Sequence, residues 1–485
     1  MQWLMGGSGK NFDSKKSRQR VCNLLLEADR QGDYRAARRI PGLDELVTGL
    51  DGTVRSNMLY SAETGLSRTG ITGARQVVYF VAGDNLYEFS NDTGVDTVNS
   101  IGAVNGSGTC RVEVNNSQEL SITNGAGTTY KYSTAGALTV SSTALNFLTP
   151  AIDVTMLNDR FYYVQRDTQN FFASELADGA TFSSLSRGQA EEHPDKLLAA
   201  RSLVSYMWLI GTRTAELWQV FDDVDFPLRK VVGRTKMQGA LSYASIAGLD
   251  DQIAFLADNN TVQLMTGSEM VQISDHDLEL RLKGNGTARF PGFSAPSDCY
   301  GFWIDDGIHR QYVLTWVSDN YTWVYDTATR LSHQRCSGDD YYRLRSSATI
   351  NGVIIAGDNK AAKIWALNPQ TYTEGTDIQK VLIVSPPISF PKDVFIERID
   401  LNMEVGQIIG NTDPLLNVRY SKNGGLTWFQ HSSVSMGVTG EYDKQVIIRD
   451  IGRLVRNKDL VIELSTTAAC HLAFYTGEIY IEESL

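Results

Sequence analysis

The chain is poor in proline, with 11 among its 485 residues, and its five cysteines lie far apart. No two cysteines have the C-x-x-C spacing that is typical of a zinc site or a redox pair. The six histidines are scattered singly, which argues against a metal centre built from converging imidazole rings. We therefore expect no metal, no cofactor and folding in a reducing compartment.

Long hydrophobic runs are also missing. The longest, such as VVYFVAG at residues 77–83, have the length of a strand and fall far short of a membrane span. The first 20 residues lack the apolar segment of a secretory signal. We expect a chain that is neither exported by a cleaved signal nor embedded in a bilayer.

Glycine is frequent, with 42 residues, and 42% of the chain is hydrophobic. Glycine supplies the backbone conformations of tight turns, so this composition favours many short strands over helices. One recurring unit supports an all-β fold: an apolar or aromatic run, a turn of Gly, Asp or Asn, and a second run. Seven such hairpins occur, at residues 77–90, 120–133, 161–174, 206–220, 253–267, 312–326 and 353–367.

The hairpins follow one another at intervals of about 40–60 residues, which is the repeat length of a β-propeller blade. We predict a propeller of six or seven blades over residues 46–380, with five tryptophans of the hairpins packed between blades. Beyond two prolines at residues 386–387, about six alternating segments predict a separate β-sandwich or jelly-roll over residues 381–485.

Acidic side chains outnumber basic ones by 56 to 44, a net charge of −12 that argues against an ordinary nucleic-acid-binding protein. Residues 1–40 differ, because they hold nine basic and four acidic side chains. We expect residues 1–45 to form an N-terminal arm, either solvated or docked on an acidic partner, and its best helix candidate is 14–33. The docking candidates are Lys15, Lys16, Arg18, Arg20, Arg35, Arg38 and Arg39.

Residues that could carry catalysis do not stand out. No Ser lies on a G-x-S-x-G elbow, and the acidic residues cluster in predicted turns rather than as a distinct pair. We therefore predict no catalytic residues.

The stretch SKNGGLTW, at residues 421–428, fits the Asp-box hairpin of sialidases, with Asn423 in place of the usual Asp. In that motif the side chains bond the amides of their own turn, so the pattern predicts a structural hairpin and not a catalytic centre. Its residues are Ser421, Asn423, Gly425, Thr427 and Trp428.

Several segments, in a shared order, make the chain similar to a known family. They are RRIPGLDEL (38–46), EEHPDK (191–196), IGTRTAELW (210–218), residues 237–267, VQISDHDLE (271–279), TWVYDTATR (322–330) and the C-terminal run that begins at YSKNGGLTW. With these segments the chain resembles the packaged-DNA stabilisation proteins of short-tailed bacteriophages (podoviruses), also called tail hub or nozzle subunits.

The resemblance implies a non-enzymatic virion protein of the phage tail, assembled in the host bacterial cytoplasm. It implies a ring of typically six copies below the portal and adaptor (head-to-tail connector) ring, which retains packaged DNA and conducts it during ejection. The other partners it implies are a tail needle or plug, tailspikes or fibres and, without sequence specificity, the passing genomic DNA. Asp222 and Asp223 are candidates for lining the lumen. The alternatives are a carbohydrate-binding or sialidase-like glycan-degrading propeller, and a host-side propeller scaffold.

Overall fold

The structure is a computed structural model. It describes residues 20–28, 34–63, 75–91, 94–133, 136–141, 150–179, 181–183, 185–190, 192–221, 226–284, 291–407 and 412–483. Within these residues the chain is built from strands, apart from one α-helix, α1 (His276–Leu282), and a short 3-10 turn, η1 (Tyr243–Ser245). The all-β prediction is confirmed.

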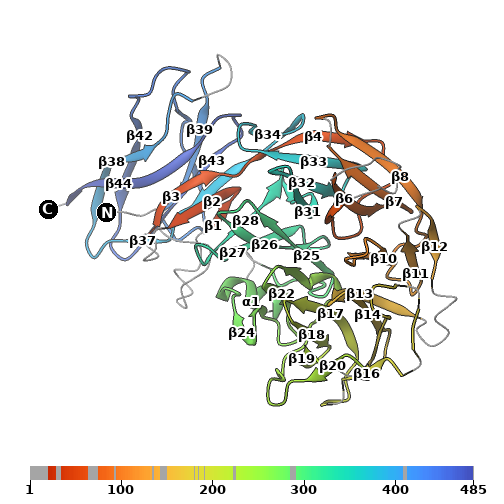
Figure 1. Ribbon diagram of the computed structural model, residues 1–485. Coiled ribbons are helices and arrows are strands. Elements are labelled where there is room, and N and C mark those ends of the chain that lie inside the picture. The colour runs from red at the N-terminus through yellow and green to blue at the C-terminus, as the bar shows by residue number, and fades with distance from the viewer. Residues whose placement is uncertain are drawn as a thin grey trace.

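Seven four-stranded antiparallel blades form a β-propeller, which Figure 1 shows as sheets arranged around a common centre. Blade 1 is β5 (Leu59–Glu63), β6 (Arg75–Ala82), β7 (Asn85–Ser90) and β8 (Thr97–Ala103). Blade 2 is β9 (Arg111–Val114), β10 (Leu120–Thr123), β11 (Thr129–Tyr132) and β12 (Leu138–Val140). Blade 3 is β13 (Ala151–Leu157), β14 (Arg160–Gln165), β15 (Asn170–Ala173) and β16 (Arg187–Gln189).

The remaining blades follow the same order along the chain. Blade 4 is β17 (Leu197–Leu203), β18 (Tyr206–Gly211), β19 (Ala215–Val220) and β20 (Leu228–Lys230). Blade 5 is β21 (Ala247–Leu249), β22 (Gln252–Leu256), β23 (Val262–Thr266) and β24 (Glu269–Gln272). Blade 6 is β25 (Cys299–Asp305), β26 (Arg310–Trp316), β27 (Tyr321–Asp326) and β28 (Leu331–Gln334).

Blade 7 closes the ring. Three of its strands are consecutive, and the fourth comes from near the start of the chain: β31 (Leu344–Ile350), β32 (Val353–Asp358), β33 (Lys363–Asn368) and β4 (Gly42–Thr48). Strand β4 runs antiparallel to β33, with Lys363 opposite Thr48 and Asn368 opposite Gly42. The inner strand β31 contacts both β25 and β5, so the last blade joins the first. Hydrogen bonds between distant segments thus close the propeller and leave no open seam between its first and last blades.

The hydrophobic core of the propeller lies between blades. Six clusters of buried side chains each draw on two successive blades. The five tryptophans that were expected between blades lie in four of these clusters: Trp208, Trp218, Trp316, Trp323 and Trp365. Each hairpin therefore buries both of its faces, which a lone hairpin cannot do.

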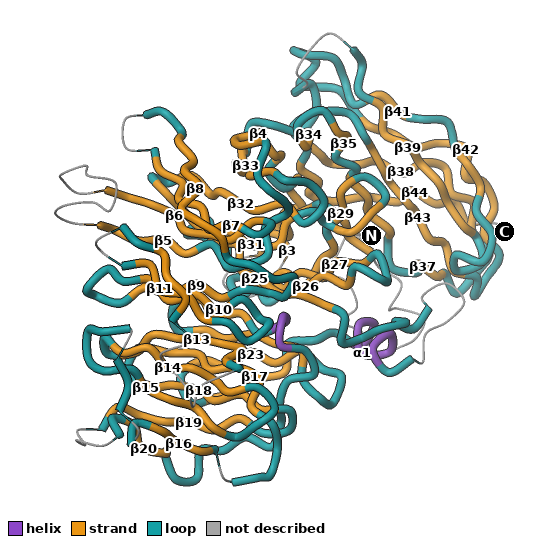
Figure 2. The backbone as a smooth tube through the Cα atoms, turned by 90° about the vertical axis from the view of Figure 1, so that its right-hand side faces the viewer, coloured by secondary structure: helices purple, strands orange, loops and turns teal. Residues whose placement is uncertain are grey.

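A second unit lies beside the propeller and consists of two sheets (Figure 2). One sheet has the order β2 (Leu24–Ala28), β3 (Tyr34–Arg39), β44 (Ala473–Glu483), β38 (Val394–Met403) and β42 (Val446–Leu454). The other contains β1 (Arg20–Cys22), β36 (Val381–Val384), β43 (Asp459–Thr466), β39 (Leu415–Ser421) and β40 (Phe429–Gln430), with β37 (Ile388–Ser389) and β41 (Val434–Ser435) at its margins. One hydrophobic core takes residues from both sheets.

The N-terminal segment differs from the expectation. Its described part forms β1, β2 and β3 of the second unit, so the helix predicted for residues 14–33 is wrong there. The run VCNLLLEA has strong helix formers, but pairing with β36 and β3 outweighs that local preference. The predicted boundary at residue 46 falls inside β4. Both sheets of the second unit also contain strands from outside residues 381–485. A sandwich formed by residues 381–485 alone therefore stays a prediction.

Strand β1 joins the two units. It pairs in parallel with β28 of blade 6 and antiparallel with β36, so one continuous sheet runs from the propeller into the second unit. Two short pairs complete the description: β29 (Cys336–Ser337) with β30 (Asp340–Tyr341), and β34 (Thr373–Glu374) with β35 (Asp377–Ile378).

Candidate functional site

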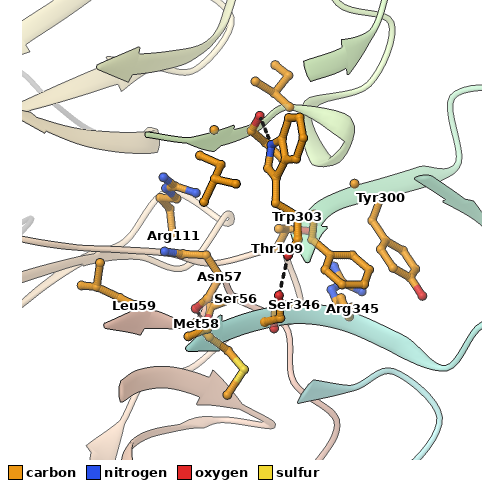
Figure 3. Close-up of a pocket in the computed structure, with 18 of the residues that line it drawn as sticks. Ser56, Asn57, Met58, Leu59, Thr109, Arg111, Tyr300, Trp303, Arg345 and Ser346 are labelled. Atoms are coloured by element: carbon orange, nitrogen blue, oxygen red, sulfur yellow. Dashed lines mark hydrogen bonds between the residues drawn. The ribbon is translucent and has the colours of Figure 1, made fainter. Parts of the chain in front are cut away.

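A cavity of about 280 Å³ lies where the inner strands meet on the propeller axis (Figure 3). Its lining comes from residues 56–59, 109–111, 113, 201, 243, 244, 246–249, 300–303, 305 and 345–349, and thus from blades 1, 2, 4, 5, 6 and 7 or the segments that lead into them. The cavity is slightly smaller than the roughly 300–1,000 Å³ of typical small-molecule sites.

Three arginines line this cavity, and each is held by neighbouring groups. An oxygen of Glu113 lies 2.7 Å from Arg111, on the same strand. Arg345 donates to the hydroxyl of Thr109 at 2.9 Å, which ties blade 7 to the segment before blade 2. Its guanidinium also lies 5.0 Å from the ring centre of Tyr300. The guanidinium groups of Arg111 and Arg345 are therefore engaged in contacts within the protein.

The third arginine belongs to a buried ionic cluster. Arg201 on β17 lies 2.5 Å from the carboxylate of Asp153 on β13, and both side chains are almost fully buried. Asp153 also accepts hydrogen bonds from the amide of Ala200 at 2.9 Å and from the hydroxyl of Tyr243 at 3.0 Å. This cluster links blades 3 and 4 to the turn that enters blade 5.

The pKa values in the cluster favour the ion pair. Burial works to lower the pKa of Arg201, but the Asp153 carboxylate, Tyr243 and Glu113 together more than offset it, so the pKa lies above the ordinary value. Burial raises the pKa of Tyr243, and the Asp153 carboxylate adds to the rise. Tyr243 therefore stays a neutral donor, and the cluster holds one cation and one anion. Such a pair can hold blades together through charge-assisted hydrogen bonds.

An aromatic side chain that lines the cavity also makes a structural contact between blades. Trp303 donates from its indole nitrogen to the carbonyl of Ala247 at 3.0 Å, which joins blades 6 and 5 (Figure 3). Among the residues that the structure describes, no group of three or more His, Cys, Asp or Glu side chains could hold a metal ion. In the same part of the chain, no helix is long and apolar enough to cross a membrane. Side chains from several blades thus pack together at the axis and enclose a small polar cavity.

The Asp-box-like hairpin has the geometry expected from its sequence. Ser421 Oγ accepts from the amide of Gly425 at 2.8 Å, and Asn423 Oδ1 accepts from the amides of Leu426 and Thr427 at 3.1 and 2.9 Å. The Asn423 amide group also donates to Thr427 Oγ1 at 2.8 Å. The polar atoms of the motif thus bond within the hairpin.

The backbone and the tryptophan complete that hairpin. Gly424 and Gly425 have φ of 68° and 86°, a conformation that glycine adopts without steric cost. Trp428 is half-buried, packs beside a small core cluster that includes Cys22, and lies 5.3 Å from the Arg419 guanidinium. The motif is a structural staple of the second unit and gives no support to a glycan-binding function.

The residues of the predicted docking arm lie in different environments. Three of its members lie outside the described residues: Lys15, Lys16 and Arg18. Arg20 is partly buried on β1 and donates to Gln334 at 2.6 Å. Arg35 lies on β3, and Arg38 on the same strand is exposed.

Arg39 is not an arm residue. Its side chain is buried, and its guanidinium donates to the side chain and carbonyl of Gln379 and to the carbonyls of Tyr372, Ala468 and Cys470. These partners belong to the segment that leaves blade 7 and to the loop before β44. The expectation that Arg39 is available for docking is therefore wrong, because the residue joins the N-terminal strand to both units.

The lumen candidates Asp222 and Asp223 lie outside the described residues. The Asp153–Arg201 pair was not predicted, although its signal is present: each charge interrupts an apolar segment, in AIDVTML and in LLAARSL. A charged side chain within a buried strand requires a partner, so such positions predict internal ion pairs.

Comparison with known proteins decides the family. The family model described as bacteriophage P22 Gp10, β-propeller, matches residues 36–372, which is more than half of the chain. The chain belongs to this family. It is therefore a structural phage protein of the packaged-DNA stabilisation type, as the sequence motifs indicated. No curated protein matches it.

Solved structures resemble it only as propellers. Virginiamycin B lyase from Staphylococcus aureus is 10% identical over 67% of this chain and 98% of its own, with a TM-score of 0.44. BamB from Moraxella catarrhalis is 10% identical over 71% and 92%, with a TM-score of 0.38. The Pan2 WD40 domain of Neurospora crassa is 8% identical over 69% and 96%, with a TM-score of 0.39. At these values the likenesses carry no information on function.

Proposed function

We propose that this protein is a ring-forming subunit of a short phage tail, which retains packaged DNA below the connector and conducts it during ejection. The observation that carries the proposal is the family match over residues 36–372. Two further observations support the proposal. The packed propeller axis indicates where DNA does not pass, and the acidic composition disfavours binding of DNA to the wall.

The propeller axis is too narrow for DNA. A sphere of the volume of the axial cavity, 280 Å³, would be about 8 Å across, which is the depth of a single groove of the duplex. The Arg201–Asp153 ion pair and the hydrogen bond from Arg345 to Thr109 join neighbouring parts of the propeller at this cavity. DNA therefore passes through the centre of a ring of copies, and each propeller forms part of the wall.

A conduit should not bind the DNA that passes through it. Each Lys or Arg that contacts a phosphate adds affinity through counterion release, so a basic wall would slow the passage of DNA. The net charge of −12 opposes such binding, and the axial arginines are engaged with the protein itself. Since salt screens charges beyond roughly 8 Å, only acidic groups near the lumen contribute, and Asp222 and Asp223 remain candidates.

Rings of identical subunits need head-to-tail contacts that close by rotation. We expect six copies that assemble on the portal and adaptor, with the needle or plug and the tailspikes as later partners. The purified protein should then sediment as a monomer and form rings only when connector particles are added. Stable hexamers of the purified protein alone would contradict this order of assembly.

DNA retention tests the function itself. Packaged particles made without this protein should lose nuclease-resistant DNA, and addition of the purified protein before nuclease treatment should restore it. Arg38→Glu, which changes an exposed side chain of β3, tests whether the N-terminal strands take part in docking. Full DNA retention by particles that lack the protein would overturn the proposed function.

A further inference from the structure

Two of the five cysteines meet, although 314 residues separate them. Cys22 ends β1 and Cys336 begins β29, and their sulfur atoms lie 2.8 Å apart. A disulfide bond is about 2.05 Å long, so the sulfurs need to move closer by only about 0.8 Å. The other three cysteines are buried, whereas Cys336 is partly exposed.

The pair lies at the junction between the two units. Strand β1 pairs with β36 over three residues, but it meets β28 of blade 6 at one residue pair, Cys22 with Gln334. The hydrogen bonds across this junction include one from the Asn23 amide to the Gln334 carbonyl and one from Arg20 to the Gln334 side chain. A covalent link beside such a short pairing would strengthen it substantially.

Hydrogen bonds between the Asn23 side chain and the Cys336 backbone hold the two cysteines in place. The side chain of Asn23, next to Cys22, accepts from the Cys336 amide at 3.0 Å and donates to the Cys336 carbonyl at 2.8 Å. Asn23 is fully buried and has a φ of 57°, which turns the chain directly after β1. The approach of the sulfurs is thus set by the backbone of both segments.

We propose that Cys22 and Cys336 form a reversible disulfide when the folded protein meets a small-molecule disulfide such as oxidised glutathione. The Cys336 sulfur passes its proton to the neighbouring Cys22 thiolate along their hydrogen bond and attacks one sulfur of glutathione disulfide, which breaks the S–S bond and releases one glutathione after proton uptake. Cys22 then releases its proton, attacks the Cys336 sulfur and displaces the second glutathione, which takes up a proton. In total two protein thiols are oxidised and one glutathione disulfide is reduced to two thiols.

The surroundings of the pair favour a thiolate at Cys22. The hydrogen bond from Cys336 lowers the pKa of Cys22, and the cationic Arg20, Lys380 and Arg335 lower it further. The same hydrogen bond, together with burial, raises the pKa of Cys336. The buried sulfur is therefore the better thiolate for the second, resolving step, and the exposed sulfur is the one that the oxidant reaches first.

The remaining cysteines provide internal controls. Cys110 and Cys299 are buried, so the oxidant does not reach their sulfurs as it reaches that of Cys336, and burial raises their pKa to about 11 and about 12. We expect oxidised glutathione to leave these thiols, and that of Cys470, in the reduced form. The proposal does not depend on the function proposed above.

The test treats the full chain with oxidised or reduced glutathione and then counts free thiols after denaturation. The expected result is a loss of two of the five thiols, a mass lower by two hydrogen atoms, and a peptide that joins Cys22 to Cys336. The oxidised protein should also melt at a higher temperature than the reduced protein. This difference should vanish in Cys336→Ser and in Cys22→Ala, and should persist in the matched control Cys110→Ser.

Two outcomes would overturn the proposal. One is five free thiols after oxidation of the folded wild-type protein. The other is a glutathione adduct that stays on Cys336, which would show that Cys22 cannot resolve it. If one cysteine variant fails to fold, the thiol count and the peptide map of the wild-type protein still decide the question.

Discussion

Replacement of Arg39 by alanine tests how the N-terminal strand is joined to the rest of the molecule. The guanidinium makes five hydrogen bonds, to the segment that leaves blade 7 and to the loop before β44. Burial lowers the pKa of Arg39 to about 10, so the side chain stays charged at neutral pH. Arg39→Ala removes all five bonds and leaves the acceptors without their donor.

The expected cost follows from these contacts. A hydrogen bond to a charged group contributes roughly 1.5–3 kcal/mol, but bonds made by one guanidinium are not additive. Buried acceptors left without a donor cost about 1–3 kcal/mol each, and because these bonds are not additive we expect a total loss of about 3–5 kcal/mol. For a domain of ordinary size this lowers the melting temperature by roughly 10 °C.

The assay compares the thermal unfolding of Arg39→Ala with that of two further variants. Arg38→Ala changes the exposed neighbour on the same strand and should alter stability by less than about 0.5 kcal/mol. Arg39→Lys keeps the charge but not the planar set of donors, so it should remain close to Arg39→Ala. The reasoning is refuted if Arg39→Ala melts like the wild type, or if lysine restores full stability.

Substitutions at three further residues test other parts of the structure. Asp153→Ala leaves Arg201 buried without its carboxylate and should lower the stability by about 3–5 kcal/mol in thermal melts; an unchanged melting temperature would contradict the ion pair. Burial raises the pKa of Glu374 to about 7 from 4.5, so folding binds a proton and stability falls as pH rises through that window. Glu374→Gln should remove this slope and gain on the order of 3 kcal/mol at pH 8, and equal slopes would refute it. Asn423→Ala should cost about 1–2 kcal/mol in urea unfolding and Asn423→Asp little, because only aspartate keeps the acceptor; equal losses would disprove the staple.

The blades could be predicted because their signals are local. In the hairpin of residues 77–90, the turn predicted at Gly83 joins β6 to β7, and Gly83 has a φ of 53°. A Cβ atom at Gly83 would lie 2.8 Å from the backbone of Asp51, so the position needs glycine for space as well as for conformation. All seven predicted hairpins form the two central strands of a blade.

The closure of the propeller and the junction between the units could not be predicted in this way. Strand β4 pairs with β33 more than 300 residues away, and the short strand β1 lies between β28 and β36. Such pairings leave no periodic pattern in the sequence, because each strand is specified by partners that are remote along the chain. Arg39 was assigned to a basic arm for the same reason, since its five acceptors all come from the distant residues 372–470.

Electron cryomicroscopy of the neck of a virion that carries this protein tests the central claim most directly. The account predicts a ring of copies below the connector, with DNA density on the axis of the ring and none within the axis of any propeller. Absence of the protein from the neck, or DNA density that runs through a propeller, would contradict it.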